Sequence, residues 1–101
     1  MKTELRQPYR TFFGTLANQC RLDIIEALKD APMNVTQISR KTNFGQPTVS
    51  HNLQRLQRCG YVFVKARGKE RIYELNKGTI KPLLILMSKH MNNYCEHNLI
   101  D

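Results

Sequence analysis

Residues 46–60 read QPTVSHNLQRLQRCG, and this stretch decides the fold. Pro47 suits the first turn of a helix, where its missing N–H group has no partner to lose. Gly60 suits the left-handed position that ends a helix. Between them, at about 100° per residue, lies one apolar stripe made of Val49, Leu53 and Leu56. The stretch therefore predicts an amphipathic helix that buries one side.

The opposite side of this predicted helix carries hydrogen-bonding and cationic side chains and no acid. Arginine can bind O6 and N7 of guanine, and glutamine can bind adenine, so this side suits base edges in a DNA groove. The alternative is an ordinary solvated helix face. The candidate DNA-binding residues of this recognition helix are Gln46, Pro47, Thr48, Ser50, His51, Gln54, Arg55 and Arg58.

A shorter helix is predicted just before it, over residues 35–42, from the spacing of Val35, Ile38 and Thr42. Asn43-Phe44-Gly45 follows as a tight turn, in which we expect Gly45 to take a positive φ. Two short helices joined by a glycine-containing turn form a helix-turn-helix unit.

A β-hairpin is predicted directly after the recognition helix. Residues 61–67 and 70–75 are β-branched and aromatic, and Gly68-Lys69 separates them. Cations at such a hairpin can reach phosphates or a minor groove, although edge strands also carry lysine merely to prevent aggregation. The candidate DNA-binding residues of this wing are Lys65, Arg67, Lys69 and Arg71.

The rest of the chain predicts three further helices. One runs roughly over residues 8–17, and a second closes near Asp30 before a break at residues 31–34. A long final helix is capped by Thr79. The fold class is therefore mainly α with a β-hairpin wing. Four helices, two strands and a helix form a single winged helix-turn-helix domain over residues 1–101.

The final helix has more apolar surface than one small core needs, which suggests a partner helix. We expect residues 9–17 and 79–97 to be dimerisation helices, although the stripe could instead cover the chain's own first helix. The candidate dimer-interface residues are Phe12, Phe13, Leu83, Leu84, Met87, Met91 and Tyr94.

Several motifs carry a resemblance to one family. Residues 16–25, LANQCRLDII, resemble the "LA(N/D)-x-x-RL-x-IL" opening of ArsR-type winged-helix regulators. QPTVSHNL at residues 46–53 is similar to that family's "VSHxL" recognition helix. CGYV at 59–62 and RIYEL at 71–75 match its "AGLV" and "xxYxL" segments. The resemblance covers roughly residues 10–95. It implies a homodimer, joined through the first and last helices, that represses transcription at a palindromic operator.

Charge supports a polyanionic partner. The net charge is +8, and no Asp or Glu occurs from Ala31 to Lys69. The longest apolar run is too short to span a membrane, and the start shows no signal peptide, so we expect a cytoplasmic protein without membrane contact.

We expect double-stranded DNA as the partner. The alternatives are a winged-helix protein-interaction module, an enzyme and an RNA binder. No base–nucleophile arrangement or phosphate loop stands out to support an enzyme, and no stacking aromatics stand out to support an RNA binder.

Family members that sense a signal carry metal-binding residues or reactive cysteines, and this sequence has few of either. Residues 34–38 lack the Cys-x-Cys of one metal-sensing branch of the family, and the final helix offers His90, Glu96 and His97 without the early aspartate of the other branch. We therefore predict no metal and no cofactor. Relatives that sense oxidants use two thiols, which makes Cys20 and Cys95 the candidate redox residues, although Cys20 lies earlier than the family position.

Overall fold

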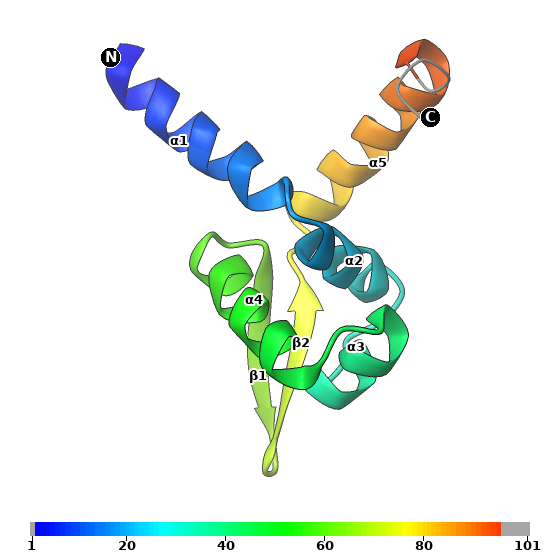
Figure 1. The fold of residues 1–101 in the computed structure, drawn as a ribbon. Helices are drawn as coiled ribbons and strands as arrows, with labels where there is room; N and C mark the ends of the chain where they lie inside the picture. Colours follow the sequence, from blue (N-terminus) through cyan, green and yellow to red (C-terminus); the bar gives the residue numbers. More distant parts are fainter. Residues whose placement is uncertain (1, 96–101) are drawn as a thin grey trace.

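The computed structural model of the chain describes residues 2–95, and its side chains from residue 7 to residue 94. Its elements are α1 (Lys2–Leu16), α2 (Gln19–Leu28), α3 (Val35–Thr42), α4 (Gln46–Arg58), β1 (Val62–Arg67), β2 (Glu70–Leu75), α5 (Ile80–His90) and the π-helical turn η1 (Met91–Cys95). Figure 1 shows this order along the chain. The predicted winged helix-turn-helix fold is confirmed.

The core lies between α2, α3, α4 and the inner face of the hairpin. The predicted stripe of α4 is at its centre, because Val49, Leu53 and Leu56 are completely buried. Ile24 and Ile38 meet it from α2 and α3. Burying these aliphatic side chains is the main force that fixes α4 in place.

The wing is a two-stranded antiparallel hairpin in which Val62 pairs with Leu75 and Arg67 with Glu70. Two further contacts attach it to the loop before α3. Met33 and Tyr73 exchange backbone hydrogen bonds of 3.0 and 2.8 Å. The Asn34 side-chain amide donates a 3.0 Å hydrogen bond to Glu70. The hairpin is therefore tied to the helix-turn-helix as well as to α4.

The turn before α4 corrects one prediction. Asn43, not Gly45, takes the left-handed conformation, with φ of 66°, and Gly45 has φ of −63°. Asparagine tolerates this region because its short side chain crowds the backbone little. Its backbone N–H donates to the Ser39 carbonyl and so ends α3. The left-handed Gly60, with φ of 77°, is as predicted.

The start of α5 corrects a second prediction, that Thr79 caps the helix. The Thr79 side chain makes no capping hydrogen bond. Oδ1 of Asn76 instead accepts from the backbone N–H groups of Gly78 and Thr79, at 3.0 and 3.3 Å. The Asn76 carbonyl accepts from Ile80 and Lys81. Asn76 reaches these groups because it lies one turn before the helix, in an Asx-type turn.

The two terminal helices also differ from their predicted bounds. α1 begins at Lys2 rather than near Pro8, which lies inside the helix and removes one backbone hydrogen bond without ending it. The last helix changes at Met91 to the wider π-helical turn. Spacing by 3.6 residues therefore does not carry the predicted stripe on to Tyr94. Residues 96 and 97 of the predicted dimerisation helix lie outside the described residues.

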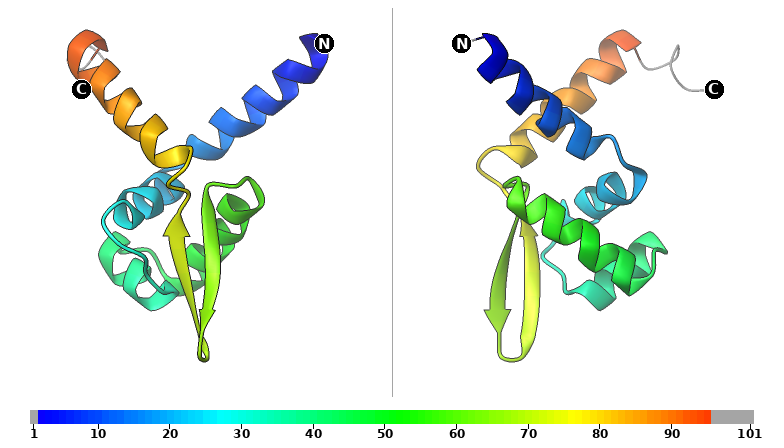
Figure 2. Two further views of the ribbon diagram at one scale, coloured as in Figure 1. Left: turned by 180° about the vertical axis from the view of Figure 1, so that it is seen from behind. Right: turned by 60° about the vertical axis from the view of Figure 1, so that its left-hand side comes forward.

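α1 and α5 leave the body as two diverging arms, on the side away from the hairpin tip (Figure 1). The view from behind in Figure 2 shows the same divergence. The alternative that the apolar stripe of α5 covers the chain's own α1 does not fit this arrangement. Across residues 2–95, no helix is both long enough and apolar enough to cross a membrane.

Candidate nucleic-acid interface

The solvent side of α4 is the centre of the candidate interface. Its exposed members are Gln46, Pro47, Thr48, His51, Gln54 and Arg58, whereas Ser50 and Arg55 are half-buried. Gln57, which was not predicted, is exposed beside them. No carboxylate occurs on α4. This surface therefore presents donors, acceptors and positive charge without an acid that would repel phosphate.

Asn52 is the polar residue of α4 that sequence reasoning missed. It is 7% exposed, between the apolar positions of the helix. Its Oδ1 accepts a 2.9 Å hydrogen bond from Nε of Arg21, and its Nδ2 donates at 3.0 Å to the Thr48 carbonyl. A buried amide with partners of this kind holds its helix in one orientation.

The start of α4 is also held against α3. Nε2 of Gln46 donates a 3.3 Å hydrogen bond to Oγ1 of Thr36. Oγ of Ser39 donates at 2.6 Å to the Phe44 carbonyl in the turn between the two helices. The N-terminal end of α4, which is the part of a recognition helix that usually reaches base edges, is thus fixed by hydrogen bonds.

The four predicted cations of the wing are all exposed, but they do not share one face. By the register of the hairpin, Lys65 and Arg67 lie on one face, while Arg71 pairs with Ala66 on the other. Lys69 lies in the turn. The tip of the wing therefore carries positive charge on both sides.

Two acids reduce this charge. Nζ of Lys65 lies 3.1 Å from Oε2 of Glu74. Glu70 lies opposite Arg67 and accepts from Asn34. In the part of the wing nearest its tip, Arg67, Lys69 and Arg71 remain as the cations best placed for a phosphate backbone. The hairpin tip projects beyond the helices, away from the two arms (Figures 1 and 2).

The arms carry the candidate dimer residues. Phe13, Met91 and Tyr94 are exposed, whereas Phe12, Leu83, Leu84 and Met87 are half-buried. Three further apolar side chains that were not predicted are exposed on the same helices: Tyr9 on α1, and Ile85 and Leu86 on α5. α5 is therefore apolar on nearly every side, which is typical of a helix covered by another part of a protein.

Cys20 and Cys59 are free thiols in the part of the chain that the structure describes. Cys20 is buried in the core, and burial raises the pKa of its thiol above the ordinary value, a shift that a hydrogen bond with Asn52 opposes. Such a thiol is mostly protonated near neutral pH and reacts slowly. Sγ of Cys59 lies 3.6 Å from Oγ1 of Thr15. The side chain of Cys95 lies outside the described residues, so the predicted redox pair is untested.

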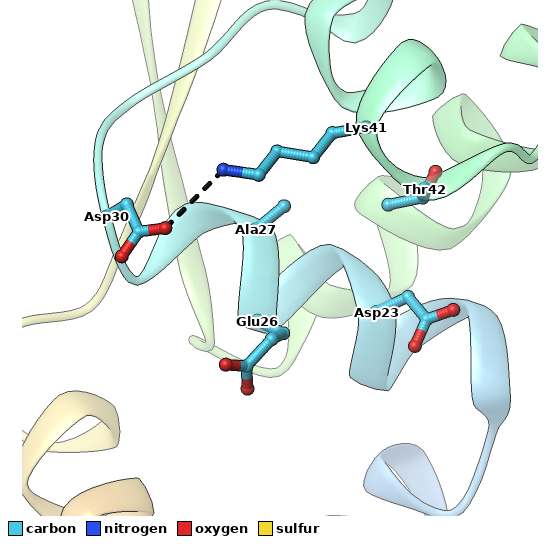
Figure 3. A pocket seen from close by; sticks show the side chains of 6 residues that line it. All are labelled: Asp23, Glu26, Ala27, Asp30, Lys41 and Thr42. Atoms are coloured by element: carbon cyan, nitrogen blue, oxygen red, sulfur yellow. Dashed lines mark hydrogen bonds and ion pairs between the residues drawn. The ribbon is translucent and has the colours of Figure 1, made fainter.

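A pocket of about 270 Å³ lies between α2 and α3, away from the recognition residues. Figure 3 shows Lys41 reaching Asp30 across it, with Asp23 and Glu26 on the α2 side. Its three carboxylates make it unsuited to a nucleic acid. Among the side chains that the structure describes, no three His, Cys, Asp or Glu residues gather closely enough to hold a metal ion.

Comparisons with known proteins agree with this geometry. The family model for bacterial regulatory proteins of the arsR family matches residues 18–63, which comprise α2, α3, α4 and the start of β1. The HTH-type transcriptional regulator NmtR of Mycobacterium tuberculosis is 31% identical over 80 residues, covering 76% of this chain and 67% of that protein.

Solved structures extend the likeness to the arms. The homodimeric winged helix-turn-helix DNA-binding domain of Mb0332 from Mycobacterium bovis has a TM-score of 0.84 and 26% identity, covering 99% of this chain and 93% of that one. Rv0081 of M. tuberculosis has a TM-score of 0.82 and 27% identity, covering 88% and 90%. The superposition with Mb0332 includes α1 and α5, because it takes in nearly the whole chain.

Proposed function

The chain belongs to the arsR family of bacterial regulatory proteins and is a DNA-binding winged-helix transcriptional regulator, and we propose that it represses transcription as a homodimer bound to a palindromic operator. One observation carries the proposal. The exposed side of α4 is polar and free of acid, its buried side is fixed in the core, and a basic wing lies next to it.

In this proposal α4 enters the major groove. His51 and Gln54 lie on the exposed side, where their side chains can bond base edges, and Gln46 and Thr48 lie nearest the N-terminal end. Arg58 is exposed one turn further on and suits a guanine or a phosphate. Arg55 is half-buried, so its guanidinium has a narrower range of positions than that of Arg58.

The wing contacts the DNA backbone or the adjacent minor groove. Gly68 takes the left-handed conformation, with φ of 64°, which allows a tight turn at the tip of the wing. The exposed cations Arg67, Lys69 and Arg71 lie next to this glycine in the sequence. Cations at this place add affinity with little sequence preference, because phosphate is the same at every base pair.

Dimerisation follows from the two arms. α1, α5 and η1 expose apolar side chains that the single chain leaves uncovered, among them Phe13, Leu86 and Met91. The Mb0332 domain, whose fold includes both arms, is a homodimer. We propose the faces that contain Phe12, Phe13, Leu83, Leu84, Met87, Met91 and Tyr94 as the interface. A two-fold dimer presents two copies of α4 to one side of the duplex, which suits a palindrome with half-sites about 34 Å apart.

Repression then requires only occupancy, because a dimer seated across a promoter excludes the polymerase. The dimer would act in the cytoplasm, where chromosomal DNA is accessible. No cofactor enters the proposal.

Selection of bound duplexes from a random pool tests the function. Purified protein is incubated with random duplexes at physiological salt, and the bound fraction is sequenced after several rounds. We expect an inverted repeat whose half-sites are one helical turn apart. A reporter placed behind that sequence should fall in expression when the protein is produced. Recovery of the random pool without enrichment would instead favour a protein-interaction module.

A further inference from the structure

The end of α1 is hydrogen-bonded to the DNA-reading part of the fold through two of its backbone carbonyls. The Phe12 carbonyl accepts from the hydroxyl of Tyr61, at 2.5 Å. The Thr15 carbonyl accepts from Nη1 of Arg21, at 3.1 Å. The Thr15 carbonyl lies in the last turn of α1, where carbonyls have no partner within the helix, so Arg21 satisfies a group that would otherwise need water. For the Phe12 carbonyl, the hydroxyl of Tyr61 is a donor from outside the helix.

The Arg21 contact continues directly into α4. Nε of Arg21 donates to Oδ1 of Asn52 at 2.9 Å, and Nδ2 of Asn52 donates to the Thr48 carbonyl at 3.0 Å. Thr48 is one of the exposed residues at the reading end of α4. A continuous path of directional bonds thus joins the last turn of α1 to the first turns of α4.

Tyr61 forms the second contact, at the other end of α4. Its ring is completely buried and stacks on that of Phe12, with ring centroids 5.0 Å apart and an interplanar angle of 24°. Its backbone N–H donates to the Leu56 carbonyl in α4. Its own carbonyl accepts from the N–H of Asn76, which begins the turn into α5. α1 and the turn that leads into α5 therefore meet the C-terminal end of α4 at one residue.

Two attachments at opposite ends of a helix fix its direction, which a single attachment does not. Apolar contacts alone let a helix slide or rotate slightly, whereas hydrogen bonds have preferred distances and angles. α1 is one of the arms that the proposed dimer uses, and it diverges from the body with its other end free of the domain (Figure 1).

We propose that Arg21, Asn52 and Tyr61 are positioning residues that fix the direction of α4 relative to α1, and thereby the half-site spacing that the dimer accepts. This inference rests on the proposed function. Adding one base pair moves a half-site by about 3.4 Å and rotates it by roughly a tenth of a turn. A rigid connection rejects that displacement, while a loosened connection tolerates it.

The test compares affinities for three duplexes that differ only in the centre of the selected operator: the native spacing, one base pair added and one removed. The variants are Tyr61→Phe, which removes one hydroxyl, and Asn52→Ala, which removes the Arg21 contact. The control is Ile24→Val, which loosens the core without touching either path. Sedimentation is used to verify that each variant is dimeric.

We expect the wild type and Ile24→Val to bind the altered spacings at least about tenfold more weakly than the native one. Each positioning variant should reduce this ratio to about threefold or less. If both variants keep the wild-type ratio, the residues serve stability only and the inference is wrong. If the wild type itself binds all three duplexes equally, the connection is not rigid and the inference is wrong, although the proposed function stands. Failure to select any inverted repeat would instead contradict the proposed function.

A measurement without DNA covers the case in which Asn52→Ala unfolds. A ketone amino acid at Gln57, on the exposed side of α4, carries a nitroxide, and electron-spin resonance gives the distance between the two labels of the free dimer. Tyr61→Phe should broaden the distance distribution, whereas Ile24→Val should not. An unchanged distribution in Tyr61→Phe would contradict the proposal.

Discussion

Nζ of Lys65 lies 3.1 Å from Oε2 of Glu74 on the outer face of the hairpin, so one cation of the wing is already paired within the chain. We predict that Glu74→Gln releases this lysine and strengthens binding to all duplexes. Affinity should rise by about two- to fivefold at low salt, with a slope of log affinity against log salt that is steeper by up to about 1. Fluorescence anisotropy at four salt concentrations measures both quantities.

Glu26→Gln is the matched control for this change. Glu26 pairs with Lys29 on α2 at 3.3 Å, in a pair that is remote from the wing and that, like Lys65–Glu74, has one strongly exposed partner. Neither substitution should change stability much, because exposed ion pairs contribute little. Equal effects of the two substitutions on DNA binding would mean that net charge, not the wing, is responsible.

Two further variants should distinguish contacts to bases from contacts to phosphates, because the first change sequence preference and the second change affinity for every sequence. Gln54→Ala should relax the preference at one base pair by about 1–3 kcal/mol, because its amide is the group proposed to contact a base edge. Lys69→Ala should weaken binding to every sequence and lower the salt slope by about 1. Lys77→Ala is the control, since Lys77 is an exposed lysine outside the proposed interface.

These effects are read from anisotropy titrations on the selected operator and on its single-base variants. A uniform loss of affinity for Gln54→Ala, with the base preference intact, would remove that residue from the reading surface. A loss as large for Lys77→Ala as for Lys69→Ala would remove the wing.

The dimer interface is tested by placing a charge on the arm. Phe13 is 56% exposed on α1 in the single chain, and we predict that Phe13→Glu gives a monomer at micromolar concentration, because a carboxylate buried in an apolar interface lacks a partner. Leu22→Glu is the control, since Leu22 is 42% exposed on α2, outside the arms. Sedimentation velocity distinguishes the species. A dimer that survives Phe13→Glu but not Leu22→Glu would place the interface on α2.

The start of α5 predicts a contrast between two neighbouring residues. Asn76→Ala removes the acceptor for two backbone N–H groups and the donor of the 2.9 Å bond to the Gly60 carbonyl. We expect a loss of about 1–2 kcal/mol in the free energy of unfolding, as for other lost caps. Thr79→Ala should change it by less than about 0.5 kcal/mol, because its side chain makes no cap bond. Urea unfolding measures both, and the reverse order of effects would contradict the structure.

Alkaline pH should destabilise the fold through Tyr61. Burial raises the pKa of its hydroxyl above the ordinary value of 10.0. The unfolded chain therefore loses this proton at a lower pH than the folded chain does. Stability is retained below pH 10 and falls as the pH rises further, by up to about 1.4 kcal/mol per pH unit for one group. Cys20 acts in the same direction from about pH 9.

The comparison that isolates this effect is Tyr61→Phe. The free energy of unfolding, measured in urea from pH 7 to pH 11, should fall less steeply above pH 10 in the variant than in the wild type. Parallel curves would show that Tyr61 does not ionise differently in the folded and unfolded chains.

The helices and the wing could be predicted because each depends on a local pattern. The stripe of Val49, Leu53 and Leu56 needs only the helical period, and Gly60 needs only the φ that ends α4. Asn52 could not be found in this way. The helical period places it beside the apolar stripe, but its polar side chain gives no sign of burial, because its partner Arg21 comes from another helix.

The errors have a similar origin. Thr79 directly precedes α5 and was therefore predicted to cap it, but the side chain of Asn76, in the preceding turn, accepts from the N–H groups of Gly78 and Thr79. Gly45 is the more permissive residue, but the chain needs its left-handed residue at Asn43, where α3 ends. Ile85 and Leu86 were missed because a single-stripe reading of α5 assigns apolar residues to one face only. Contacts that join distant segments, or a second chain, are not visible in local spacing.

The most direct test of the central claim is a titration of the selected duplex with wild-type protein, followed by both anisotropy and sedimentation at physiological salt. The account predicts two chains per duplex and an affinity at least about a thousandfold above that for a scrambled duplex of equal length. One chain per duplex, or equal affinity for the scrambled sequence, would contradict it.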